Sequence, residues 1–239
     1  MGHSRRLIPL LVCLVFVASF SGCLPRSPSE QGQDVNSLYD FFTVFAVVIF
    51  VITCGLIGWS IVRYRKKPGD DELPAQFHSN LPLEITWFAI PQVIVIILFV
   101  VSVVGLNNVN HISPNPDLTV NVTGFQWGWN FQYGGTDVTL HSTPRDQATM
   151  YLPTDRDVVF RITSQDTIHS FYVPQLLTKR DAIPGNINEV PMNITEPGTY
   201  DGHCAEFCGT LHSKMNFEVK AVPAGQFETW LSGQQQGGG

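Results

Sequence analysis

Four potential metal ligands lie close together near the C-terminal end of the sequence. Their spacing is C-x3-C-x3-H-x2-M, and they are Cys204, Cys208, His212 and Met215. A fifth candidate, His169, lies upstream within the segment Asp-Thr-Ile-His-Ser-Phe. Thiolate and thioether sulfurs are soft ligands and imidazole is intermediate, so this set favours copper over magnesium or calcium. The sequence therefore predicts a copper site.

Five such side chains are more than one copper ion needs, because a blue-copper site takes two histidines, one cysteine and a weak methionine. The second cysteine suggests two sulfurs that bridge two copper ions, each with one histidine. Met215 would complete one ion, and a backbone carbonyl in the cysteine loop the other. Sharing one electron over two ions keeps the ligand geometry nearly constant, which suits electron transfer better than substrate turnover.

Two other interpretations use the same residues. A Cys204–Cys208 disulfide suits an oxidising compartment but leaves His212 and Met215 without a role. A structural zinc site of the Cys2His2 type makes no use of the methionine and normally has C-x2-C spacing. The remaining histidines have no such neighbours, and we expect them on the surface or in loops: His78, His111, His141 and His203.

The first 23 residues have the layout of an export signal. An apolar run over residues 7–22 follows two arginines and ends in small residues before Cys23, as in a secretory signal peptide. The segment Ser-Gly-Cys at 21–23 also resembles a bacterial lipoprotein cleavage box. We expect a signal peptide over 1–22 and a lipidated Cys23; the alternative is an ordinary signal peptide that leaves a free thiol.

Two uncharged stretches, residues 41–62 and 85–106, have the length that an α-helix needs to cross a membrane. Buried helices of a soluble protein are disfavoured, because so small a chain cannot enclose two uniformly apolar helices. The basic segment at 63–67 between them marks the cytoplasmic side. The sequence thus predicts a transmembrane hairpin over 38–110, preceded by a tether over 23–37, with both termini extracytoplasmic.

From residue 111 onward, short β-rich runs alternate with turns rich in Pro, Gly and Asp, for example at 118–122, 158–163 and 215–222. This pattern predicts an all-β external domain over 111–232, either a sandwich or a small barrel. We expect one helical turn at 227–231 and a disordered tail over 233–239.

The predicted external domain is acidic, with seven basic and thirteen acidic side chains and thus a formal charge of −6. This balance disfavours nucleic acid as a partner. An acidic surface accelerates the encounter with a basic partner protein, although the same charge also serves solubility.

Together these features resemble subunit II of the haem-copper cytochrome c oxidases, whose copper-A motif reads C-x-E-x-C-x3-H-x2-M. The resemblance extends over the hairpin, the aromatic segment 126–133, the segments 166–174 and 181–185, and the copper loop. It implies a membrane-anchored, cupredoxin-like Greek-key β-barrel. It also implies six copper ligands, namely His169, Cys204, Cys208, His212, Met215 and the backbone carbonyl of Glu206. The Glu206 side chain would bind a magnesium ion shared with subunit I.

The resemblance also assigns roles to residues outside the copper loop. Trp127 would be the residue at which electrons arrive from cytochrome c. Glu84, where the second helix begins, would mark the mouth of a proton path into subunit I, although an acid here also stabilises the helix dipole. The family commonly has a tyrosine where this chain has Gly128 and an acidic residue where it has Gln132. These two differences affect the expected details of cytochrome docking. Docking candidates are Asp137, Asp146 and Asp166.

The sequence therefore predicts a respiratory subunit of a bacterial cell membrane. It would accept electrons from cytochrome c at a two-copper centre and pass them to subunit I, where oxygen reduction is coupled to proton pumping. A quinol oxidase subunit II typically lacks the copper ligands. A nitrous oxide reductase would be a soluble enzyme with a further catalytic copper domain, and a copper chaperone would need neither Trp127 nor Glu84. No C-x2-C-H haem motif occurs, which excludes a fused cytochrome c domain.

Overall fold

The computed structural model of the chain describes residues 25–66, 69 and 75–237. It contains two compact units: one combines Met1–Gln33 with Ile112–Gly239, and the other is Asp34–His111. The predicted signal peptide over 1–22 and the lipidation site Cys23 lie outside the described residues.

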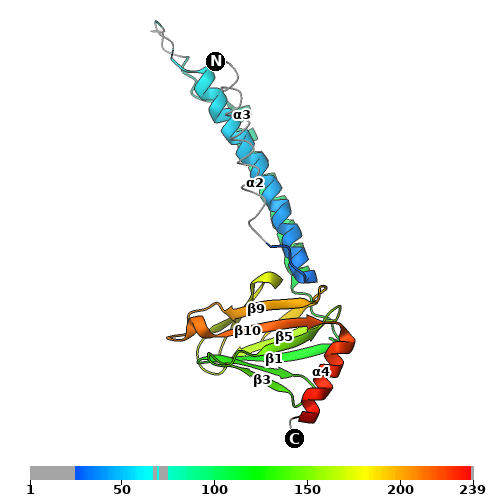
Figure 1. Cartoon of the computed structure of the whole chain (residues 1–239). Coiled ribbons are helices and arrows are strands. Elements are labelled where there is room, and N and C mark those ends of the chain that lie inside the picture. The colour runs from blue at the N-terminus through cyan, green and yellow to red at the C-terminus, as the bar shows by residue number, and fades with distance from the viewer. Residues whose placement is uncertain (1–24, 67–68, 70–74, 238–239) are drawn as a thin grey trace, which may run out of the picture. The chain divides into compact units, whose positions relative to one another are not determined.

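Two long helices, α2 (Glu30–Arg63) and α3 (Leu81–Val109), contain the two predicted spans (Figure 1). Both are long and apolar enough to cross a membrane. Helix α3 has an N-terminal cap in which Asn80 Oδ1 accepts from the backbone N–H of Leu83 at 3.2 Å, and Glu84 Oε1 accepts from the backbone N–H of Asn80 at 3.0 Å. These bonds satisfy backbone donors that would otherwise be free at a helix start. The helix continues through Pro91.

The β-domain consists of two five-stranded sheets, with strand orders β3-β2-β1-β5-β8 and β4-β10-β9-β6-β7. Its first sheet contains β1 (Leu118–Phe125), β2 (Gly128–Tyr133), β3 (Thr139–Ser142), β5 (Val158–Ser164) and β8 (Asn188–Met192). The second contains β4 (Thr149–Pro153), β6 (His169–Val173), β7 (Thr178–Ala182), β9 (Gly198–Cys204) and β10 (Asn216–Val222). Short 3-10 helices, η1 (Pro174–Leu176) and η2 (His212–Lys214), follow β6 and precede β10.

Strand pairing in both sheets is mixed: β1 pairs in parallel with β5 and β4 in parallel with β10, whereas the other pairs are antiparallel. Burial alternates along β1, as expected for a strand with one face on a core. The prediction of a membrane-anchored, cupredoxin-like all-β domain is confirmed, and its two sheets form a sandwich.

An aromatic core supports the end of the sandwich that carries the predicted ligands. The rings of Phe171 and Phe217 stack with centroids 4.8 Å apart, and both meet the fully buried Trp129 edge to face. Trp129 also contacts the imidazole of His169, with ring centroids 6.0 Å apart. Large rigid rings of this kind bury much apolar area and hold one another in place. The strand that carries His169 therefore packs on a rigid aromatic core.

The N-terminal segment before α2 differs from the tether expected over 23–37. Ser29 is fully buried and forms a β-bridge with Ile194. The backbone N–H of Thr195 donates to the Pro28 carbonyl at 2.8 Å, and that of Glu30 donates to the Asn193 carbonyl at 2.9 Å. Because these backbone groups find partners on the β-domain, the segment is part of that domain and leads directly into α2.

The C-terminal helix is longer than the predicted turn at 227–231. Helix α4 spans Ala224–Gly237 and so includes residues 233–237, which were expected to be a disordered tail (Figure 1). Phe227 is buried, and Trp230 stacks on Tyr151 of β4 with centroids 4.6 Å apart. These two aromatic side chains, three residues apart, lie on one face of the helix and attach it to the sandwich.

Candidate metal centre

Strand pairing brings the distant ligand segments together at one end of the second sheet. His169 is the first residue of β6 and Cys204 the last residue of β9, and Phe171 pairs with Cys204 across these two strands. The backbone N–H of Cys204 donates to the Met215 carbonyl at 3.1 Å, so the chain that leaves β9 returns beside it into β10. The loop between them carries Cys208 and His212.

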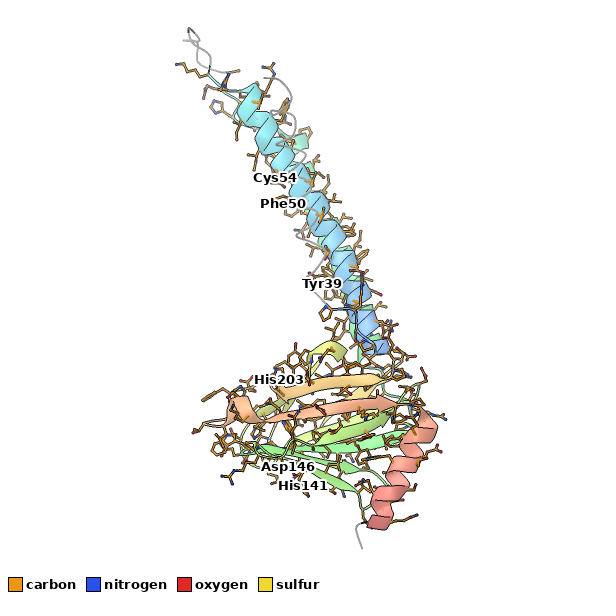
Figure 2. All side chains as sticks on the ribbon, viewed as in Figure 1. Tyr39, Phe50, Cys54, His141, Asp146 and His203 are labelled. Atoms are coloured by element: carbon orange, nitrogen blue, oxygen red, sulfur yellow. The ribbon has the colours of Figure 1, made fainter. Side chains whose placement is uncertain are left out.

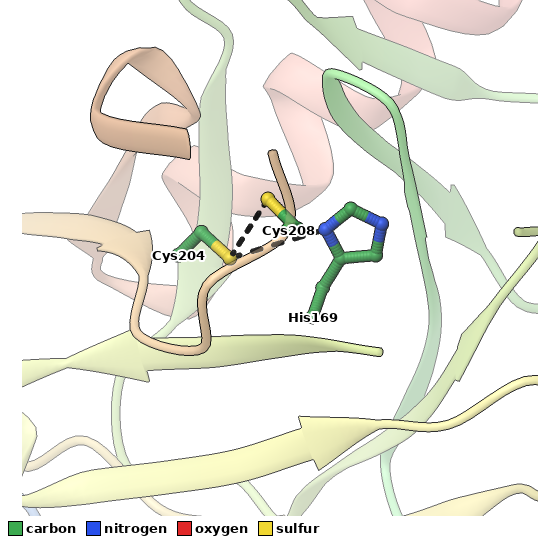
Figure 3. Close-up of side chains that lie close together, drawn as sticks. All are labelled: His169, Cys204 and Cys208. Atoms are coloured by element: carbon green, nitrogen blue, oxygen red, sulfur yellow. Dashed lines mark hydrogen bonds between the residues drawn. The ribbon is translucent and has the colours of Figure 1, made fainter. Parts of the chain in front are cut away.

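The sulfur atoms of Cys204 and Cys208 face each other, and that of Cys204 also faces the imidazole of His169 (Figure 3). Cys204 Sγ is 3.9 Å from Cys208 Sγ and 3.9 Å from His169 Nδ1. Cys208 Sγ is in turn 3.5 Å from His212 Nδ1 and 3.3 Å from Met215 Sδ. Each cysteine therefore faces one histidine, and the two sulfurs face each other.

The disulfide interpretation does not fit this geometry. A disulfide requires sulfur atoms about 2.05 Å apart, whereas Cys204 and Cys208 are free thiols separated by 3.9 Å. The zinc interpretation leaves Met215 unused although this side chain is buried and its sulfur contacts Cys208. The donor set is therefore a better match to copper, which accepts thiolate, imidazole and a weak thioether together.

Glu206 presents its backbone and its side chain to different surroundings. Its carbonyl oxygen lies 3.3 Å from Cys204 Sγ, on the cluster side of the loop, whereas the residue as a whole is exposed. The carbonyl is thus available to the same site as the sulfurs, and the carboxylate is available to a partner outside the domain.

The two thiols differ strongly in acidity. Burial disfavours the thiolate of Cys204, but hydrogen bonds, chiefly from His169, outweigh it and lower the pKa of Cys204 to about 7. Burial and the adjacent negative charge of Cys204 raise the pKa of Cys208 to about 12. Because metals bind thiolates, metal loading of this site would release thiol protons.

Asp166, predicted as a docking residue, is exposed and also contacts the predicted ligand His169. Its Oδ1 accepts from His169 Nε2 at 2.9 Å, which leaves His169 Nδ1 directed at Cys204. The carboxylate also accepts from the backbone N–H groups of Thr167 at 2.7 Å and Gln126 at 2.6 Å. A carboxylate partner of this kind fixes the tautomer and the ring orientation of a ligating histidine. Burial by itself would raise the pKa of Asp166, but these hydrogen bonds outweigh burial and hold the pKa below its usual value.

Trp127 lies directly against the copper loop. Its indole Nε1 donates to the Cys208 carbonyl at 3.2 Å, and the Gln126 side chain donates to the same oxygen at 2.8 Å. Gly209 makes this approach possible, because its φ of +118° disfavours other residues and an added Cβ would lie 3.1 Å from the indole. Sequence analysis missed Gln126, and the only signal was its place beside Trp127.

The other predicted residues are not at the cluster. Glu84 caps helix α3 in the other unit. Asp137 and Asp146 are exposed on the turns before and after β3, and Figure 2 labels Asp146 together with His141 of β3 and His203 of β9. The predicted surface histidines are exposed or, in the case of His203, half-buried: His78, His111, His141 and His203.

Two apolar helices followed by a sandwich with a buried His-Cys-Cys cluster define a membrane-anchored protein of the cupredoxin type. Two family models match the chain: the periplasmic domain of cytochrome c oxidase subunit II over residues 118–222, and its transmembrane domain over residues 18–104. The chain belongs to the cytochrome c oxidase subunit II family, and it is therefore a membrane-anchored subunit of a haem-copper oxidase complex, an oxidoreductase.

Curated relatives agree with this assignment. Cytochrome c oxidase subunit 2 of Alkalihalophilus pseudofirmus is 34% identical over 96% of this chain and 68% of its own length. The probable subunit 2 of Streptomyces avermitilis is 31% identical over 95% of this chain and 86% of its own. Among solved structures, the periplasmic domain of subunit II from Bradyrhizobium japonicum shares 29% identity, with a TM-score of 0.48, over 52% of this chain and 96% of that one.

Proposed function

We propose that this subunit accepts electrons from cytochrome c at a two-copper centre and passes them to the haem-copper site of subunit I, where oxygen is reduced and protons are pumped. The observation that carries the proposal is the pair of thiols 3.9 Å apart, each facing one histidine. This arrangement suits two sulfurs that bridge two ions. Bound copper would supply a one-electron centre at this position.

The ligands proposed for copper are held in place by the surrounding domain. His169 and Cys204 are anchored in β6 and β9, and the Trp129 indole donates to the Met215 carbonyl at 3.3 Å. We propose six ligands, with the backbone carbonyl of Glu206 in addition to the side chains of His169, Cys204, Cys208, His212 and Met215. Because strands and an aromatic core hold these groups from outside, their positions would change little when the charge of the centre changes.

Trp127 is proposed as the residue that receives electrons from cytochrome c. Its indole is partly exposed, and its N–H group touches the carbonyl of the ligand Cys208. This contact provides a short path from the surface to the cluster. Asp137 and Asp146 are exposed acids that would attract a basic cytochrome, as would the acidic surface in general.

Further roles concern the rest of the complex. We propose that the exposed Glu206 carboxylate binds a magnesium ion shared with subunit I, since hard oxygen ligands suit that ion. We propose that Glu84 lies at the mouth of a proton path into subunit I. The exposed basic side chains of Arg63, Arg65 and Lys66 would face the cytoplasm, and the copper domain would then lie outside a bacterial cell membrane. Cys23 would carry a lipid there.

The test is electron paramagnetic resonance of the purified oxidase complex, together with its copper content per subunit II. A spectrum from one unpaired electron shared equally by two copper nuclei supports the proposal. A spectrum from a single copper nucleus at this subunit, or zinc in place of copper, would overturn it.

A further inference from the structure

Gln126 contacts both of the segments that carry the proposed ligands. It lies in the turn between β1 and β2, and its side-chain Nε2 donates to the Cys208 carbonyl at 2.8 Å. Its backbone N–H donates to Asp166 Oδ2 at 2.6 Å, and the other oxygen of that carboxylate accepts from His169 Nε2 at 2.9 Å. One residue thus connects the Cys208 loop to the imidazole of His169.

These two contacts act on opposite ends of the cluster. His169 faces Cys204, whereas Cys208 faces His212 and Met215. Segments that are distant in the sequence meet here, since Gln126 is 82 positions from Cys208 and 40 from Asp166. A shift of the turn would therefore be transmitted to ligands of both proposed copper ions.

The Cys208 carbonyl receives two donors, the Gln126 amide at 2.8 Å and the Trp127 indole at 3.2 Å. A carbonyl oxygen has two lone pairs and can accept both bonds. The shorter bond comes from Gln126, so its amide is well placed to hold this oxygen where the indole can reach it. Without the Gln126 amide, the Trp127 indole would be the only side-chain donor from the β1–β2 turn to the Cys208 carbonyl.

We infer that Gln126 is a positioning residue, which holds the Cys208 carbonyl through its side chain and the Asp166–His169 pair through its backbone. The inference rests on the proposed copper function. Partners that hold ligands from outside tune a metal site, and their loss commonly costs roughly 10-fold or more in affinity or activity. Since Gln126 is also exposed beside Trp127, the competing role is contact with the cytochrome.

The test compares two variants in the purified oxidase complex. Gln126→Met removes the amide donor at nearly the same side-chain length, and Gln126→Glu places an acceptor against the Cys208 carbonyl. Both should retain copper, shift the copper hyperfine pattern and near-infrared absorption, and slow electron transfer from bound cytochrome roughly 10-fold. The shift should be larger for the glutamate. Gln165→Met, at an exposed glutamine on the neighbouring β5–β6 turn, is the matched control and should leave the spectrum unchanged.

A docking role gives a different result. Glutamate adds a negative charge that attracts a basic partner and methionine does not, so KM for cytochrome c would respond differently in the two variants while the copper spectra stay as in the wild type. That result overturns the inference. A wild-type complex without the two-copper spectrum overturns the proposed function as well, whereas a normal wild-type spectrum with unchanged variant spectra overturns the inference alone.

Discussion

Substitutions within the copper loop should distinguish the residues proposed to bind copper from the carboxylate proposed to bind magnesium. Cys208 Sγ lies 3.9 Å from Cys204 Sγ, 3.5 Å from His212 Nδ1 and 3.3 Å from Met215 Sδ. Cys208→Ser or Cys204→Ser replaces a sulfur that is proposed to bridge two copper ions by a hydroxyl, which is a poor substitute for a soft anionic ligand. Either variant should lose the two-copper spectrum and the oxidation of cytochrome c.

Glu206→Gln should behave differently, because it keeps the backbone carbonyl that lies 3.3 Å from Cys204 Sγ and changes only an exposed side chain. A substitution at such a position changes the free energy of unfolding by about 0.5 kcal/mol at most, so the domain should stay folded. Copper should remain at the wild-type level. The signal of magnesium, or of manganese substituted for it, should weaken because a neutral amide is a weaker ligand for a hard cation.

The assay measures both metals in the same purified complex, by elemental analysis and by electron paramagnetic resonance. Cysteine variants should lose copper, and the Glu206 variant should lose mainly magnesium. If Glu206→Gln empties the copper site as completely as Cys204→Ser, the proposed division between carbonyl and carboxylate is wrong.

Four further predictions concern other parts of the chain. Trp127→Gln should leave copper loading intact and lower the electron-transfer rate from cytochrome c by orders of magnitude in flash-induced kinetics; a parallel loss of docking affinity would contradict this. Trp129→Phe removes one of two donors to the Met215 carbonyl, at a cost of about 0.5–1.5 kcal/mol, and should lower the temperature at which copper is lost more than Trp127→Phe does; equal temperatures would argue against it. Glu84→Gln should slow steady-state oxygen reduction while reduction of copper by cytochrome c stays normal, and full turnover would leave Glu84 only its capping role. Mass spectrometry of the mature subunit should find a diacylated Cys23 as its first residue, a result that any other N-terminus would refute.

Much of the site was predictable from the sequence because its information is local. The spacing of Cys204, Cys208, His212 and Met215 places soft ligands on one loop, and ligand type alone favours copper. The two uncharged stretches predict helices by length and hydrophobicity. The β-runs predict an all-β domain, either a sandwich or a small barrel, and the structure has two five-stranded sheets.

Contacts between distant segments were decided only by the tertiary structure. From the sequence, Asp166 was predicted only as a surface acid. In the folded chain its carboxylate accepts hydrogen bonds from the imidazole of His169 and from the backbone N–H of Gln126 in the β1–β2 turn. Pro28 looked like part of a free tether, yet its carbonyl bonds to Thr195, 167 positions away. Gln126 carries no signal of its own, since its importance depends on a carbonyl 82 positions distant. A pattern of residue types specifies which ligands are present, but hydrogen bonds to backbone atoms depend on where the folded chain brings those atoms.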